Sequence, residues 1–134
     1  MVTGYRRSIR GAQRGFTLIE VIMVVVVVGI LAAIAMPAYQ GQVRKGHRSA
    51  AQAQMLDIAN REQQYLLANR TYAEVDDLNF TLPPEVAERY DWDIDVGTGT
   101  VPSYTIEFTA KGAQTADGDL TLDSNGVKTP ADKW

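Results

Sequence analysis

The 134-residue sequence has no cysteine and only one histidine, His47. Without cysteine there are no disulfide bonds, no thiolate metal ligands and no cysteine nucleophile, so an exported domain of this sequence must rely on packing alone. A nucleophile elbow of the G-x-S-x-G type and a phosphate-binding glycine loop are also missing. We therefore predict a protein without catalytic residues, and we expect neither a cofactor nor a metal centre.

Charge of one sign is scarce at each end of the chain. The first fifteen residues contain four arginines and no acid, whereas residues 71–134 contain thirteen acidic and only four basic side chains, which leaves nine net negative charges. The whole chain carries −3, and removal of the first fifteen residues would change this to −7. Because phosphate binding needs lysine and arginine, we do not expect the C-terminal part to bind DNA.

A long apolar run is the most conspicuous feature that is present. Residues 16–35 can form a helix of about 30 Å, the thickness of a hydrocarbon layer. Five consecutive valines at residues 24–28 are poor helix formers in water, but a backbone in lipid has no other partner for its hydrogen bonds. The run is therefore predicted to be a helix in a membrane or in a filament core.

One ionisable residue, Glu20, lies inside this run. A carboxylate at the centre of a membrane helix costs about 2.5–3.5 kcal/mol on insertion scales, so such a residue indicates a function by default and needs a cationic partner. The alternative is that Glu20 lies at the level of the lipid headgroups, where a charge costs little.

Two simpler explanations of the N-terminal region stay open at this point. A secretory signal sequence could be cut after Ala35, since Ala33 and Ala35 form an A-x-A pattern, although the sixteen apolar residues 21–36 exceed the usual signal core. An uncleaved anchor fits the length but gives Glu20 no role. The charge bias is weak, because basic residues lie on both sides of the run, namely Arg6, Arg7, Arg10 and Arg14 before it and Arg44, Lys45 and Arg48 after it.

The sequence RGFTLIEV at residues 14–21 resembles the processing site of type IV prepilins, and GILAAIA at residues 29–35, followed by Pro37, continues the resemblance over about a third of the chain. The resemblance implies cleavage between Gly15 and Phe16 by a prepilin peptidase and methylation of the new amino group of Phe16. It also implies that the apolar helix is retained, and that Glu20 neutralises the Phe16 amine of a neighbouring subunit during filament assembly.

The helix is predicted to continue beyond the run, with a kink at Pro37 and an end near Asn69, which could serve as a C-terminal cap. Apolar residues recur at helical spacing and should face the rest of the protein: Tyr39, Val43, Ala51, Met55, Ile58 and Tyr65. A basic cluster also lies here, made of Arg44, Lys45, His47 and Arg48. It either contacts lipid headgroups or solvent, or pairs with acidic parts of neighbouring subunits.

The C-terminal part reads as a small sheet. Residues 71–89 are predicted to be a connecting loop with at most a turn of helix. Residues 90–96 and 104–110 alternate between apolar and polar side chains, a short strand follows at 119–123, and Asn125-Gly126 indicates a tight turn into residues 127–129. We predict an α+β fold of the type IV pilin kind, with a long N-terminal helix packed on a three- to four-stranded antiparallel sheet.

Acidic residues on the strands raise the question of a calcium site. Asp91, Asp93 and Asp95 share one strand face, and a second group lies near Asp119, but the spacing matches no EF-hand loop, so solvated acidic strands are preferred. The tail at residues 119–130 and Trp134 are similar to one group of minor pilins, some of which bind DNA. The cysteine pair usual there is missing, and we expect Trp134 to pack on the sheet instead.

The predicted organisation is a basic leader (1–15), a membrane or filament-core helix (16–36), an amphipathic helix (37–70), a loop (71–89) and a sheet with its tail (90–134). The resemblance implies a type IV pilus subunit, more specifically a minor pilin, held in the inner membrane and then polymerised into a surface filament for motility, adhesion or DNA uptake. Its partners would be other pilins, the prepilin peptidase and methyltransferase, the assembly machinery and membrane lipid. The alternatives are a pseudopilin of a type II secretion system and a membrane-tethered or secreted small binding domain.

Overall fold

A computed structural model describes residues 15–134. The predicted leader, apart from Gly15, lies outside the described residues. The chain divides into two compact units with the boundary after Ala38, although one helix, α1 (Leu18–Asn69), contributes to both. Each unit is therefore described by itself, and residues 39–134 are called the head.

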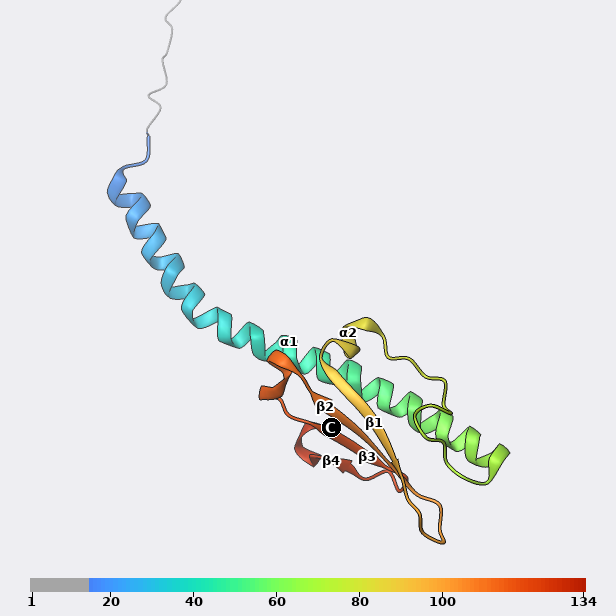
Figure 1. Cartoon of the computed structure of the whole chain (residues 1–134). Coiled ribbons are helices and arrows are strands. Elements are labelled where there is room, and N and C mark those ends of the chain that lie inside the picture. The colour runs from blue at the N-terminus through green and yellow to red at the C-terminus, as the bar shows by residue number, and fades with distance from the viewer. Residues whose placement is uncertain (1–14) are drawn as a thin grey trace, which may run out of the picture. The chain divides into compact units, whose positions relative to one another are not determined.

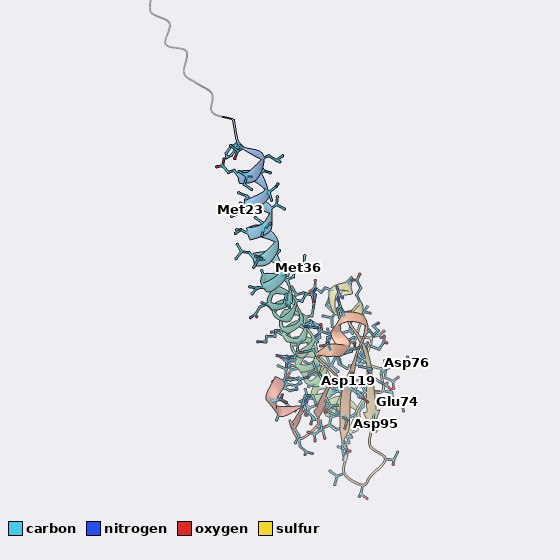
Figure 2. The ribbon with its side chains drawn as sticks, turned by 90° about the vertical axis from the view of Figure 1, so that its left-hand side faces the viewer. Met23, Met36, Glu74, Asp76, Asp95 and Asp119 are labelled. Atoms are coloured by element: carbon cyan, nitrogen blue, oxygen red, sulfur yellow. The ribbon has the colours of Figure 1, made fainter. Side chains whose placement is uncertain are left out.

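In the first unit, α1 presents a long apolar surface after Glu20, its one ionisable residue there. Every residue from 15 to 38 is exposed, and Met23 and Met36, labelled in Figure 2, are 60% and 67% exposed. Within the described part of the chain, α1 is the one helix long and apolar enough to cross a membrane, by length and composition. Such a surface needs lipid or other protein around it. Pro37 lies inside α1, and the kink that we predict there stays a prediction.

In the head, α1 ends through a left-handed residue. The residue with positive φ is Arg70 (φ 61°), not Asn69, and its backbone N–H donates to the carbonyl of Leu66 at 2.8 Å. Asn69 contributes with its side chain, whose amide donates to the carbonyl of Tyr65 at 3.2 Å. The bond from Arg70 satisfies a carbonyl of the last turn that the helix end would otherwise leave without a partner.

Four antiparallel strands form one sheet in the order β1-β2-β3-β4, as the arrows in Figure 1 show. They are β1 (Tyr90–Val96), β2 (Tyr104–Ala110), β3 (Leu120–Asp123) and β4 (Lys128–Thr129). Three short helices complete the head: α2 (Pro84–Ala87) and the 3-10 turns η1 (Gly112–Ala116) and η2 (Ala131–Lys133). The predicted α+β fold is confirmed.

The core forms where one face of α1 meets one face of the sheet. From α1 it takes Ala51, Met55 and Ile58, all fully buried. The segment between α1 and β1 adds Tyr72, Ala73, Leu78, Leu82 and Val86. Alternate residues of the strands supply the rest, because successive strand side chains point to opposite faces. They are Tyr90, Ile94, Tyr104, Ile106, Phe108, Ala110, Leu120 and Leu122.

The predicted helix stripe is wrong at its start. Tyr39 is 72% exposed and Val43 is 38% exposed, while Tyr65 is only partly buried. The fully buried residue closest to Tyr65 on this helix is instead Glu62. Helical spacing alone could not show where the sheet stops covering the helix.

The C-terminal tail is attached to the head by several polar contacts. The side-chain amide of Gln52 donates to the carbonyl of Lys133 at 2.7 Å, and the Lys133 ammonium donates to the carbonyl of Asp117. As predicted, Trp134 packs against the core, and the Lys128 ammonium lies 4.8 Å from the centre of its ring. These contacts fix the tail in a chain without disulfides.

Candidate functional site

The predicted processing site lies just before α1. Gly15 and Phe16 are exposed and non-helical, and Thr17 caps the helix, because its hydroxyl accepts from the backbone N–H of Glu20 at 3.2 Å. The Gly15–Phe16 peptide bond therefore precedes the first helical residue, Leu18. Its position leaves the bond open to another protein.

Glu20 occupies the first turn of α1, on the same side as Phe16. The two side chains border one shallow depression with Gly15 and Thr17. Thr17 and Glu20 have the spacing of a capping box, and the bond that the structure shows runs from the backbone N–H of Glu20 to the Thr17 hydroxyl, a cap that the sequence reasoning missed. The structure thus brings together Gly15, Phe16 and Glu20, the residues predicted for cleavage, methylation and assembly.

The basic cluster does not act as one unit. Arg48 forms an ion pair with Asp117 of the same head at 2.7 Å, and the two side chains are only 17% and 13% exposed. Arg48 is therefore structural, unlike the solvent-facing or intermolecular role expected for it. The alternation of polar residues along α1 gave no signal of this pairing.

Two other members of that cluster line an open groove of about 300 Å³ in the head. Arg44 and His47 of α1 border it together with Arg89, which precedes β1, and Tyr39, Val43 and Ala113 supply apolar surface. We call this the basic groove. Lys45 is exposed and lies outside it.

Gln114 of η1 lines the basic groove and connects its two sides through hydrogen bonds. It is 1% exposed, and its amide lies within hydrogen-bond distance of the carbonyl of Arg44 (3.1 Å) and the hydroxyl of Tyr90 (2.9 Å). Burial raises the pKa of Tyr90, which keeps this hydroxyl neutral at physiological pH. The contact joins α1 to the start of the sheet and so fixes the backbone beside Arg44.

Glu62 is a buried carboxyl group that sequence reasoning missed. It is fully buried; Oε2 accepts from the backbone N–H of Ala73 at 2.9 Å, and Oε1 has no hydrogen-bond partner among the described residues. Burial raises its pKa above the ordinary value of 4.5, against the opposing effect of the Ala73 hydrogen bond. The bond attaches the start of the loop after α1 to the helix.

Several of the aspartates considered for calcium have other partners. Asp91 pairs with Lys111 at 2.7 Å, Asp119 accepts from the N–H of Ala110 at 2.8 Å, and Asp123 accepts from the N–H groups of Asn125 and Val127 in the β3–β4 turn. Over residues 15–134, no three His, Cys, Asp or Glu side chains are grouped so that they could hold a metal ion.

A long apolar helix on a small antiparallel sheet, with a methylation-type site at the helix start, defines the class of type IV pilin-like proteins. Residues 10–36 match the family model described as the prokaryotic N-terminal methylation motif. Residues 37–121, well over half of the chain, match the model described as "Type IV minor pilin ComP, DNA uptake sequence receptor". The chain belongs to this minor pilin family, as the similarity of its tail predicted.

Curated relatives match over part of the chain. The chain is 51% identical over 43 residues to fimbrial protein EcpC of Eikenella corrodens, covering 32% of this chain and 28% of that protein. It is 62% identical over 34 residues to fimbrial protein Q of Moraxella bovis, covering 25% and 22%. It is 35% identical over 60 residues to type II secretion system core protein G of Escherichia coli K12, covering 45% and 41%. The chain thus spans less than half the length of each of these relatives.

Proposed function

We propose that the chain is a minor subunit of a type IV pilus, processed at Gly15, held in the inner membrane by residues 16–36 and then polymerised into a surface filament. The observation that carries this proposal is the combination of an exposed apolar helix with a folded head. The helix buries none of residues 15–38 within its own chain. A subunit of this kind is stable only in lipid or among the helices of its neighbours.

The charged groups at the helix start explain how one subunit could recognise the next. Cleavage before Phe16 would create an amine at the end of an apolar helix, and Glu20 is a carboxylate four residues further on. Each charge is costly in an apolar environment, and pairing between neighbouring subunits would remove much of that cost. The membrane would thus hold subunits before assembly, and the Phe16 amine and the Glu20 carboxylate would become paired in the filament.

The same proposal sets the topology and the partners. The leader would stay in the cytoplasm and the head would face the periplasm, after cleavage and methylation of Phe16 by the prepilin peptidase and methyltransferase. Assembly machinery of the inner membrane would then extract the helix. Pro37 would provide a kink where the apolar half of α1 ends.

The decisive experiment is the intact mass and N-terminal residue of the protein from its host membranes, followed by a search for it in sheared filaments. We expect a mature chain that starts at methylated Phe16 and is present in the filament fraction at low abundance. A start at Met36 would identify a cleaved signal sequence, and a retained Met1 an uncleaved anchor. Either start would overturn the proposal.

Substitution of Glu20 separates its two possible roles. Glu20→Gln keeps the length and polarity of the side chain but removes the charge, whereas Glu20→Ala removes both and leaves the backbone bond to Thr17 available. If the charge matters, both variants are inserted and processed but enter filaments poorly, because an unpaired buried amine costs about 3–5 kcal/mol. Normal incorporation of Glu20→Gln would show that assembly does not need the charge of Glu20.

Two alternative functions each have one observation that supports them. The match to core protein G supports a pseudopilin of a secretion system, in which case the processed chain would be missing from surface filaments. The family description names a DNA uptake sequence receptor, but the excess of nine acidic charges over residues 71–134 opposes phosphate binding. A gel-shift assay with duplex DNA at 150 mM salt would test this second alternative.

A further inference from the structure

We propose that the basic groove binds the phosphate headgroup of an anionic phospholipid in the membrane that holds α1. The inference deepens the proposed function and rests on it, because the groove meets lipid only while residues 16–36 lie in a bilayer. It names the lipid class and the site that hold the subunit before assembly. Three observations carry it: the arginines of the groove have no anionic partner, no acid lines the groove, and the groove follows the membrane segment closely in the chain.

Arg44 and Arg89 are half-buried cations without a partner. Among the described residues, neither side chain forms an ion pair or a hydrogen bond. Arg48 on the same helix differs, because Asp117 neutralises it. A partly desolvated guanidinium favours a bound anion, and it can donate two parallel hydrogen bonds to phosphate oxygens. His47 adds a further N–H donor to the lining of the groove.

The lining of the groove contains no acidic side chain among the described residues, although the surrounding head is strongly acidic. Residues 71–134 carry nine net negative charges. Several of the carboxylates border a separate depression, and Figure 2 labels the first three of them: Glu74, Asp76, Asp95 and Asp93. Because the positive charge is confined to one groove, an anion is attracted to that place and repelled from much of the remaining head.

The groove begins just after the membrane segment. Tyr39 is the third residue after Met36 and Arg44 is the eighth. At 1.5 Å per residue, the backbone of Arg44 lies at most about 12 Å from the end of the segment, whatever the angle at Pro37. Helix side chains tilt toward the N-terminus of their helix, which for Arg44 is the membrane end, and a long arginine stem extends the reach. The headgroup layer is about 5–7 Å thick, so Arg44 can reach it.

The apolar lining gives a reason for two residues that the predicted helix stripe misplaced. Tyr39 is 72% exposed and Val43 is 38% exposed, and both border the groove instead of the core. Tyrosine is enriched at membrane interfaces, because its ring is apolar and its hydroxyl is polar. These two side chains would contact the glycerol backbone and the start of the acyl chains, while the arginines hold the phosphate.

A single lipid phosphate fits this groove better than a nucleic acid does. The groove measures about 300 Å³, the lower end of the range of small-ligand sites. Duplex binding typically uses about 6–10 phosphate contacts, whereas the groove offers two arginines in a head of opposite charge. An anionic lipid presents its phosphate singly, and the bilayer holds it close to the groove.

Lipid binding is measured on the full chain, purified from membranes in a neutral detergent. Native mass spectrometry counts bound short-chain phosphatidylglycerol and compares it with phosphatidylcholine of the same chain length. We expect selective binding of phosphatidylglycerol. Arg44→Gln and Arg89→Gln should each weaken this binding by about tenfold, because each removes charged hydrogen bonds to the phosphate.

Lys45→Gln is the matched control, because Lys45 is the exposed neighbour of Arg44 and lies outside the groove. It should leave phosphatidylglycerol binding unchanged, and circular dichroism of each variant confirms that it folds. Equal binding of the two lipids, or an equal loss with Lys45→Gln, would overturn the proposal. So would displacement of the lipid by an equal concentration of inorganic phosphate, because the site would then take a free anion. If the arginine variants lose duplex DNA but keep phosphatidylglycerol, the groove serves a nucleic acid and the proposal is wrong.

A dye in the groove tests whether the contact forms in a bilayer. The chain has no cysteine, so Ala113→Cys can carry one environment-sensitive dye in the groove, and Thr100→Cys carries it in the β1–β2 loop as the control. The full chain is placed in vesicles of phosphatidylcholine alone or with an equal amount of phosphatidylglycerol. We expect phosphatidylglycerol to shift the emission at Ala113→Cys only, and Arg44→Gln with Arg89→Gln to abolish the shift. No shift there, or the same shift at Thr100→Cys, would refute the site.

The N-terminal residue of the same preparation separates this inference from the function on which it rests. A chain that starts at Phe16 but shows no groove-dependent selectivity for phosphatidylglycerol would refute the lipid site alone. A chain that retains Met1 and binds phosphatidylglycerol through Arg44 and Arg89 would refute the pilus function alone. A chain that starts at Met36 lacks the membrane segment and would refute both.

Discussion

At the scale of single residues, the buried carboxyl of Glu62 has the clearest physical consequence. One oxygen is bound to the N–H of Ala73 and the other has no partner among the described residues. A neutral carboxyl group suits this position better than a charged one, because burial raises the pKa. Tyr104 lies nearby, and burial likewise raises its pKa, so this neighbour stays neutral at physiological pH.

The sign of the resulting pH dependence follows from proton linkage. The folded head holds the Glu62 proton at pH values where the unfolded chain, with an ordinary pKa near 4.5, has lost it. Stability from this residue is therefore complete at low pH and falls as the pH rises from about 4.5 through the higher folded pKa, since the folded state binds more protons. Above that pKa the contribution is constant.

Glu62→Gln should remove this dependence, because an amide does not titrate. We expect its free energy of unfolding to rise relative to that of the natural chain between pH 4 and pH 8, measured by urea unfolding of the full chain in detergent. Glu62→Ala, which also removes the acceptor for the Ala73 N–H, should cost about 1–3 kcal/mol. Parallel pH profiles for the natural chain and Glu62→Gln would contradict the assignment.

At the scale of elements, the attachment of η1 and the tail to α1 depends on few polar contacts. Arg48 of α1 binds Asp117, which directly follows η1, and Gln52 of α1 binds the backbone of η2. Residues separated by about seventy or eighty positions in the sequence are thus joined to one side of one helix. Such long-range contacts hold the segments together in a head that has no disulfide bond.

Arg48→Ala should lower the free energy of unfolding by about 1.5–3 kcal/mol, because it removes a charged hydrogen bond and leaves Asp117 part-buried without its partner. Arg61→Ala is the matched control on the same helix. Arg61 pairs with Asp57 at 3.3 Å with both side chains nearly half exposed, and it lies over the ring of Phe80. Its loss should cost less than about 1 kcal/mol. Urea unfolding of both variants in detergent makes the comparison, and equal losses would refute it.

The same elements show what the sequence could and could not predict. Strands β1 and β2 were found at their observed bounds because alternation is a local property of the chain. Glu62 and Gln114 were missed because a polar residue on a helix or in a turn looks exposed until the segment that covers it is known. Arg89 belongs to the basic groove only through folding, since it is separated from Arg44 by more than forty residues. The exposure of Tyr39 could not be predicted for the same reason, because the sequence of the helix does not show how far the sheet covers it.

At the scale of the whole molecule, the two units differ in whether they have a hydrophobic core of their own. The helix of the apolar run was predicted from the sequence, because its residues need no partner within the chain and are exposed throughout. The head needs its own core, which α1 completes with Ala51, Met55 and Ile58. The motif predicts cleavage after Gly15 and roles of Phe16 and Glu20 in assembly, whereas no local pattern predicts the basic groove of the head.

Strand β1 is an edge of the sheet, and its three exposed positions all carry aspartate. An unprotected edge strand is a template on which a second sheet can grow, and charged side chains on such a strand are a common protection against aggregation. In a filament the heads would be crowded together, so any tendency of the edges to join would be amplified. Negative charge repeated on the edge of every copy opposes edge-to-edge pairing, and the filament can then grow without its heads fusing into amyloid-like sheets.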